Sequence, residues 1–195
     1  MSGAPACRIC LVTPPAFEPA AFASLLARML DAGDVASLRL RLPGADADAI
    51  ARAAEALLRV THRADIALLL DGVHVPAGMA AAARATFGDA GSVGAACGGS
   101  YDDAMAAAEA GADYVAFGPA SGAHAVARET VADWASAMVV PCIVSGGIDR
   151  DAAGSWASTG AEFLEFGRAA WDAPEGPEQA LRGLLDAIAR APRPA

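Results

Sequence analysis

The sequence predicts an α/β fold, a (β/α)8 or TIM barrel, as a single domain over residues 1–195. Short apolar segments alternate with alanine-rich segments of helical periodicity, giving seven clear strand-to-helix steps and one unclear step. No linker, low-complexity tract or charge run divides the chain. No GxGxxG motif follows the first strand, which disfavours the alternative, an open doubly wound sheet.

The first strand, Arg8–Val12, is apolar and ends at Thr13-Pro14-Pro15. Apolar residues at helical spacing then predict a helix over residues 22–31, which Gly33 ends. The second strand, residues 36–42, alternates leucines with Ser37, Arg39 and Arg41, so that one face is apolar and the other carries cations. A helix follows that begins at Asp46 or Asp48 and continues to Leu57.

From residue 72 onward, β-rich segments and alanine-rich helices alternate again, and glycines end several of the helices. Proline lies in the first turn of the last helix. We expect strands at 72–75, 92–97, 113–117, 141–145 and 162–166, and helices at 77–86, 101–110, 130–137, 152–158 and 177–190.

The third unit is abbreviated, and its strand has two interpretations. In the first, which the family resemblance given below implies, the strand is Arg59–Thr61 and residues 64–70 form a short helix. In the second, the strand is residues 66–71, ending at Asp71 instead of His62. Because a crossover between neighbouring parallel strands needs about a dozen residues, the two residues Asp71-Gly72 are too few, and we favour the first interpretation.

Composition excludes several classes of function. The net charge is −9, which disfavours binding to nucleic acid or to anionic membranes. No apolar run is long enough to span a membrane and no secretory signal is present at the start, so we expect a cytoplasmic protein. All 14 basic residues are arginine, which excludes lysine-dependent chemistry. The four cysteines are expected to be buried free thiols.

Two strand ends carry glycines, the segment "VSGGID" after strand seven and "FGRAAW" after strand eight. In parallel barrels these two ends often bind phosphate through backbone N–H groups, since glycine lets an anion approach closely. We therefore expect a small phosphorylated metabolite as ligand. The predicted phosphate-binding residues are Ser145, Gly146, Gly147, Gly167 and Arg168.

Five segments in order resemble the thiamine phosphate synthase family and its relative, thiazole tautomerase. They are "HRADIALLL" (62–70), "DGVHVP" (71–76), "GADYVAFGP" (111–119), "VSGGID" (144–149) and "TGAEF" (159–163). The resemblance covers most of the chain. It implies a barrel that joins a pyrimidine diphosphate to a thiazole phosphate with Mg²⁺, releases pyrophosphate and, as the family suggests, forms a homodimer.

Carried over residue by residue, the family's Gln-x-Arg-x-Lys signature falls on Arg39, Arg41 and Pro43, which makes Arg39 and Arg41 the candidate catalytic cations. A tautomerase histidine falls on Pro119, and His124 is a candidate substitute. Other functional positions of the family fall on residues that cannot replace them: the metal positions on Thr61-His62 and Gly78-Met79, a serine on Ala96 and the loop lysine on Val126.

The resemblance therefore implies a family member that binds a small phosphate ester and has weak or lost synthase activity. We expect no metal site, with Mg²⁺ needed only if synthase activity is retained. The alternatives are an active synthase or tautomerase and a non-catalytic ligand-binding or regulatory module. Glu165 on strand eight faces the barrel interior in this interpretation and needs a cationic partner such as Arg41.

Overall fold

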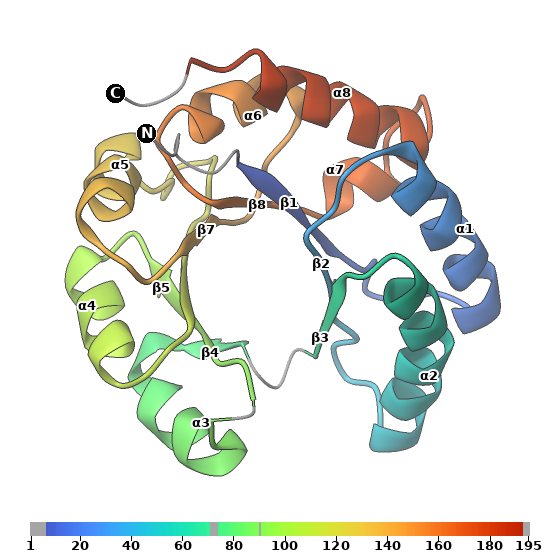
Figure 1. Ribbon diagram of the computed structural model, residues 1–195, viewed down its shortest axis with the longest axis horizontal. Helices are drawn as coiled ribbons and strands as arrows, with labels where there is room; N and C mark the ends of the chain where they lie inside the picture. The colour runs from blue at the N-terminus through green and yellow to red at the C-terminus, as the bar shows by residue number, and fades with distance from the viewer. Residues whose placement is uncertain (1–6, 71–73, 90, 193–195) are drawn as a thin grey trace.

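The computed structural model describes residues 7–70, 74–89 and 91–192. Its parallel strands form one sheet that curls into a barrel, with the helices arranged around the outside (Figure 1). The strand order is β3-β2-β1-β8-β7-β6-β5-β4, which confirms the predicted α/β barrel. The strands are β1 (Arg8–Val12), β2 (Ser37–Leu40), β3 (Ala67–Leu70), β4 (His74–Pro76), β5 (Gly94–Gly98), β6 (Tyr114–Phe117), β7 (Cys142–Val144) and β8 (Phe163–Phe166).

Carboxylate side chains cap the starts of the first two α-helices. Glu18 caps the first helix, because its carboxylate accepts the N–H groups of Ala20 and Ala21 at 3.1 and 2.7 Å. Asp46 caps the second helix through the N–H of Ala49 at 2.7 Å. The helices are α1 (Pro19–Ala32), α2 (Ala47–Arg63), the 3-10 helix η2 (Ala77–Met79), α3 (Ala80–Phe87), α4 (Tyr101–Glu109), α5 (Arg128–Ala137), α6 (Arg150–Ala157), α7 (Arg168–Trp171) and α8 (Pro177–Ala189).

Successive side chains of β2 point alternately to the outer core and to the barrel interior. Leu38 and Leu40 are buried in the large core between the strands and the surrounding helices. Arg39 lies on the other face of the strand, inside the barrel, as the sequence pattern predicts. A smaller cluster of buried residues, Cys10, Tyr114, Ala116 and Ile143, fills part of the barrel interior.

The third unit is abbreviated as predicted, but the favoured interpretation of its strand was wrong. Arg59–Thr61 belongs to α2, which continues past the predicted end at Leu57, and the strand is Ala67–Leu70. Only residues 71–73 separate β3 from β4, so this unit has no room for a crossover helix. The crossover rule assumes that the two strands are neighbours in the sheet, whereas β3 and β4 are the two ends of the strand order.

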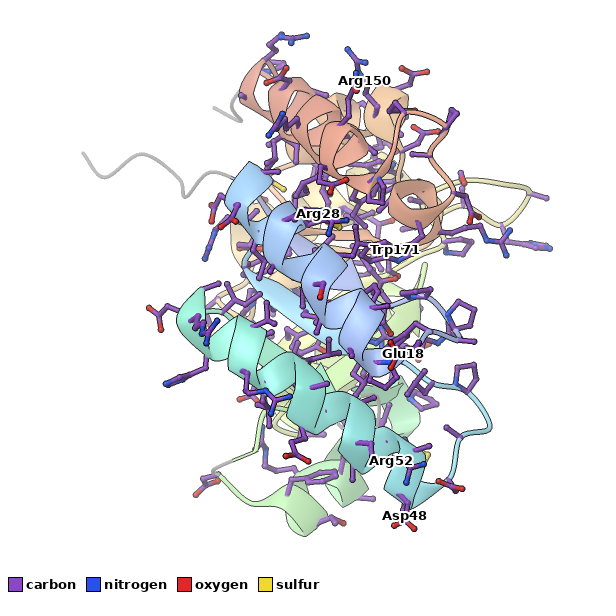
Figure 2. The ribbon with its side chains drawn as sticks, turned by 90° about the vertical axis from the view of Figure 1, so that its right-hand side faces the viewer. Glu18, Arg28, Asp48, Arg52, Arg150 and Trp171 are labelled. Atoms are coloured by element: carbon purple, nitrogen blue, oxygen red, sulfur yellow. The ribbon has the colours of Figure 1, made fainter. Side chains whose placement is uncertain are left out.

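The outer helices pack closely on one another. In Figure 2, α1 and α2 lie side by side, and Asp48 and Arg52 project from α2 toward solvent.

Within the described ranges, no helix is both long enough and apolar enough to cross a membrane.

Candidate functional site

A cavity of about 1030 Å³ opens at the carboxyl ends of the strands, where barrel enzymes place their sites. The cavity is formed by the ends of β1, β2, β7 and β8 and by the segments that follow β6 and β8. Its lining includes four of the five predicted phosphate-binding residues and one of the predicted catalytic cations, namely Gly146, Gly147, Gly167, Arg168 and Arg41.

The glycines after β7 adopt backbone conformations that favour glycine. Gly146 has φ +75° and Gly147 has φ +88°, in the left-handed region that other residues rarely occupy. In the described part of the chain, no hydrogen bond uses the N–H groups of Gly146, Gly147, Gly167 or Arg168. The cavity is therefore bordered by backbone donors from two neighbouring strand ends.

The segment after β6 is fixed to the segment after β7 by backbone hydrogen bonds. The N–H of Ser145 donates to Phe117 O at 2.8 Å, and the N–H of Ala120 is close to both Ser145 O (2.9 Å) and Gly146 O (2.7 Å). The hydroxyl of Ser145 donates to Phe117 O at 3.3 Å and is absent from the cavity lining. Ser145 thus holds the two segments together in this structure.

Arg41 is positioned by Thr13 at the ends of β1 and β2. The hydroxyl of Thr13 accepts the N–H of Arg41 at 3.0 Å and donates to Arg41 O at 3.2 Å. Thr13 is buried, so this contact fixes the backbone of Arg41 at the rim. Thr13 was not predicted from the sequence as part of the site.

Glu165, which was expected to need a cationic partner such as Arg41, contacts Arg39 inside the barrel. Arg39 Nη1 lies 2.8 Å from Glu165 Oε2, and both side chains are largely shielded from solvent, with 14% and 19% of their surface exposed. Arg39 and Glu165 come from β2 and β8, which both pair with β1.

Arg168 lines the cavity with an exposed side chain, whereas His124 is not among the lining residues. The side chain of Arg168 is 91% exposed, and its Nε is 4.0 Å from Asp172 Oδ2. His124 lies in an exposed turn after β6 and does not line the cavity. The structure thus brings Arg41 and the glycines together but does not bring His124 to them.

Trp171 is an aromatic residue of the cavity lining that was not predicted from the sequence. Its Nε1 donates to Val12 O at 2.7 Å, and its ring meets Phe22 of α1 edge-on, with the two ring centroids 5.1 Å apart. These contacts hold α7 against the end of β1, and Trp171 is labelled beside α1 in Figure 2. Only the assembled fold shows this role, because 159 positions separate the two partners of the hydrogen bond.

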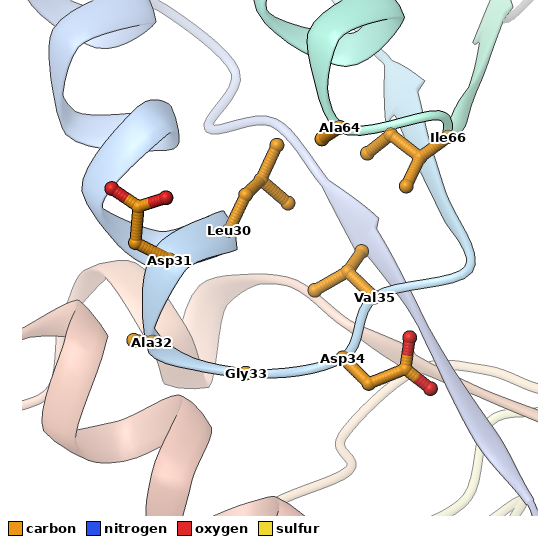
Figure 3. A pocket seen from close by; sticks show the side chains of 8 residues that line it. All are labelled: Leu30, Asp31, Ala32, Gly33, Asp34, Val35, Ala64 and Ile66. Carbon is orange, nitrogen blue, oxygen red and sulfur yellow. The ribbon is translucent and has the colours of Figure 1, made fainter.

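A second cavity, of about 320 Å³, lies between the end of α1, the start of β2 and the α2–β3 connection. Leu30, Val35 and Ile66 point toward it in Figure 3, while the carboxylate of Asp31 points away. The other acidic residue of its lining, Asp34, contacts Arg8 at 3.0 Å. This cavity is at the amino ends of the strands, on the opposite face from the glycines.

Comparison with known protein families identifies the family of this chain. The family model described as thiamine monophosphate synthase matches residues 9–169, from the second residue of β1 to the start of α7. The chain belongs to the thiamine monophosphate synthase family.

Relatives within this family match along nearly the whole chain. A thiamine-phosphate synthase of Rhodospirillum centenum is 40% identical, over 90% of this chain and 94% of its own length. One of Hyphomonas neptunium is 36% identical, over 92% of this chain and 93% of its own length. Among solved structures, thiamine phosphate pyrophosphorylase from Pyrococcus furiosus has a similar fold, with a TM-score of 0.80 at 20% identity, covering 94% of this chain and 96% of that one.

The positions that the resemblance assigns to a metal ion do not meet at the cavity. Thr61 and His62 lie in the last turn of α2, next to the start of β3 and hence on the face opposite the cavity. Gly78 and Met79, in η2, have no oxygen-bearing side chain. Within residues 7–70, 74–89 and 91–192, no group of three or more His, Cys, Asp or Glu is arranged to hold a metal ion. Because strand three is Ala67–Leu70, the carry-over of a metal position to Thr61-His62 was misplaced. The residue that follows this strand in the sequence is Asp71, which lies outside these ranges.

Proposed function

We propose that the chain binds a small phosphate ester at the mouth of the barrel, between the segments that follow β7 and β8. The observation that supports this proposal most directly concerns the N–H groups of Gly146, Gly147 and Gly167 on the border of the 1030 Å³ cavity. No hydrogen bond among the described residues uses them. An anion with several oxygens accepts from such groups simultaneously, and glycine allows it to approach the backbone.

The charges around the cavity are compatible with an anionic ligand, because most carboxylates that line the cavity already contact a hydrogen-bond donor or an arginine. Asp149 caps α6 by accepting the N–H of Ala152 at 2.8 Å, and Glu165 contacts Arg39. Asp172 lies within 4.0 Å of Arg168. In this proposal Arg41, at the rim, supplies positive charge to the ligand, and Arg168 reaches it by rotating away from Asp172.

We further propose that synthase turnover is weak or absent. Departure of pyrophosphate develops negative charge that cations and a metal ion normally stabilise. The described residues supply Arg39 and Arg41 for this purpose, and Arg39 is already held by Glu165. Among the described residues, no group of three or more His, Cys, Asp or Glu is arranged to hold a divalent ion.

An active thiamine-phosphate synthase is the second candidate function, because relatives with that name share 40% and 36% identity with nearly the whole chain. A small phosphorylated metabolite is the ligand in both cases, and no nucleic acid or membrane partner is proposed. A homodimer remains a prediction from the family.

Two measurements test these proposals. Calorimetric titration with thiazole phosphate and with inorganic phosphate measures binding, and absence of binding to both would overturn the phosphate site. An assay for thiamine phosphate formation, with and without Mg²⁺, measures the reaction. Turnover at ordinary enzyme rates, on the order of 10 s⁻¹, would contradict weak activity and favour the second candidate.

A further inference from the structure

The two flanks of α2 differ in how far they are covered. In a helix, Ala56 and Leu58 lie about 100° to either side of Leu57, whose side chain is fully buried. Ala56 is half-buried, whereas Leu58 is 52% exposed. Since α1 packs beside α2 (Figure 1), α1 covers the flank of Ala56. The flank of Leu58 is therefore the one toward the third unit, which has no room for a crossover helix that would cover it.

An apolar row of small residues runs along this uncovered flank. It consists of Ala47, Ala51, Ala54 and Leu58, which recur at intervals of four, three and four residues and so align on one face of the helix. Ala47 and Ala51 are exposed and Ala54 is half-buried. The alanines leave room for a second helix to approach closely, and Leu58 projects from the row as its one large side chain.

A row of alternating charge lies beside the apolar row. Asp48, Arg52, Glu55 and Arg59 each follow a residue of the apolar row by one position, so they form one edge of it. All four are exposed, and Asp48 and Arg52 project into solvent in Figure 2. Among the described residues, no ion pair includes any of the four. The edge is thus available to charges from outside the chain.

The order of these charges matches a second copy of the same helix in the antiparallel direction. In a parallel, in-register pair each residue meets its own counterpart, so like charges face each other. A two-fold axis that crosses α2 midway between positions 53 and 54 instead brings Asp48 opposite Arg59 of the second copy, and Arg52 opposite Glu55 of the second copy. Because the symmetry repeats both contacts, every charge of the row faces an opposite charge.

We propose that two copies of the chain associate through α2 in this antiparallel arrangement. The same axis places Leu58 of each copy over the alanines at positions 47 and 51 of the other, where it is removed from water. The apolar contact supplies affinity, and the charged row fixes the direction of the helices. The proposal is independent of the phosphate site, because no residue of α2 lines the 1030 Å³ cavity.

Sedimentation velocity of the full chain over a concentration series, at low ionic strength where exposed charges are least screened, measures the association. We expect dimers with a dissociation constant below about 100 μM. Leu58→Glu should weaken association about 100-fold, because it removes the apolar contact and buries a carboxylate against the alanines. Val139→Glu is the matched control, since Val139 is 98% exposed in the connection between α5 and β7, and it should leave association unchanged.

Charge reversal tests the direction of the helices. Arg52→Glu places like charges opposite each other and should weaken association about tenfold. Adding Glu55→Arg to Arg52→Glu restores opposite charges across the axis and should bring the affinity back to within about threefold of the wild type. At protein concentrations well below the dissociation constant, none of these exposed substitutions should change the thermal unfolding midpoint by more than about 2 °C.

Three results would overturn the proposal. The first is a chain that is only monomeric at about 100 μM. The second is a dimer whose affinity Leu58→Glu does not change, which would place the interface elsewhere. The third is a dimer that Leu58→Glu weakens but that the double charge reversal does not restore, which would exclude the antiparallel arrangement.

Discussion

Arg39 Nη1 and Glu165 Oε2 lie 2.8 Å apart inside the barrel, one on each side of β1. Removing one partner of such a pair leaves the other charge in a poorly solvated place, whereas replacing both by apolar groups avoids this penalty. Glu165→Leu should therefore lower the free energy of unfolding by about 3 kcal/mol, measured by urea denaturation. Arg39→Met combined with Glu165→Leu should be less destabilising than the sum of the two single changes.

Glu55→Gln is a suitable control for this pair, because Glu55 is an exposed residue of α2. Its effect on the free energy of unfolding should stay within about 0.5 kcal/mol. Strict additivity of the two changes inside the barrel would show that Arg39 and Glu165 do not stabilise each other.

Arg84 joins the connections at the amino ends of β5 and β6. It donates to Gly111 O at 2.9 Å and to Gly91 O at 2.7 Å, and it contacts the carboxylate of Asp113, which also accepts the N–H of Val93. Because Arg84→Met leaves several of these acceptors without a donor, it should lower the free energy of unfolding by about 3 kcal/mol, measured in urea.

The control for Arg84 is Arg52→Met on α2, where the arginine projects into solvent (Figure 2). This change should alter stability by less than about 0.5 kcal/mol. Equal effects of the two substitutions would mean that the contacts of Arg84 contribute nothing particular to stability.

The order and type of the elements were predictable from the sequence because periodicity records which faces are buried. The leucines of β2, for example, are buried in the outer core, and Arg39 lies inside the barrel. The apolar run at 66–71 was considered as a strand but was set aside, because the crossover rule was applied to two strands that are the two ends of the strand order. Whether β3 and β4 are neighbours depends on the curvature of the whole sheet, which local pattern does not encode.

The glycine-bearing ends after β7 and β8 were also predictable, because their position in a barrel follows from strand order. Ser121 and Trp171 were not. Each reaches the cavity through a contact with a distant segment, Ser121 with Gly147 and Trp171 with Val12. Such contacts depend on how successive loops pack together. The residues next to a serine or a tryptophan in the sequence do not indicate this packing.

The buried thiols predict a loss of stability at alkaline pH. Burial raises the pKa of Cys10 to about 11 and that of Cys97 to about 11, from an ordinary value of 9.0. A raised pKa in the folded chain means that the unfolded chain ionises first, so the contribution is intact below pH 9 and is lost as the pH rises toward 11. The free energy of unfolding should therefore fall across this interval, as measured by urea denaturation at a series of pH values.

Cys97→Ala separates this effect from other alkaline titrations. Without the thiol, stability should fall less steeply between pH 9 and pH 11 than in the wild type, although the variant is less stable at neutral pH. Parallel curves for the two proteins would show that ionisation of Cys97 is not linked to unfolding.

Gly147 and Gly122 share a left-handed backbone but differ in their surroundings. Their φ angles are +88° and +95°, and a methyl group would collide with Ser121 Oγ at Gly147 but meet nothing within 4 Å at Gly122. Gly122→Ala should therefore lower stability by about 1 kcal/mol, through backbone strain alone. Gly147→Ala should be more destabilising and should also weaken phosphate binding at least tenfold, measured by titration. Equal stabilities and equal affinities for the two variants would mean that the contact with Ser121 is unimportant.

Gly94 lies between His74 and Tyr114 in the sheet, and its missing side chain makes room for the tyrosine ring. Tyr114 OH is 3.0 Å from His74 Nδ1, and a methyl group on Gly94 would come within 2.0 Å of Tyr114 Cζ. Gly94→Ala should displace the ring and lower the free energy of unfolding by about 2 kcal/mol. Since Tyr114→Ala removes the obstacle, the double variant should be clearly less destabilised than the sum of the two single changes, in urea denaturation. Additive effects would show that the ring moves aside freely and that Gly94 is not required for its position.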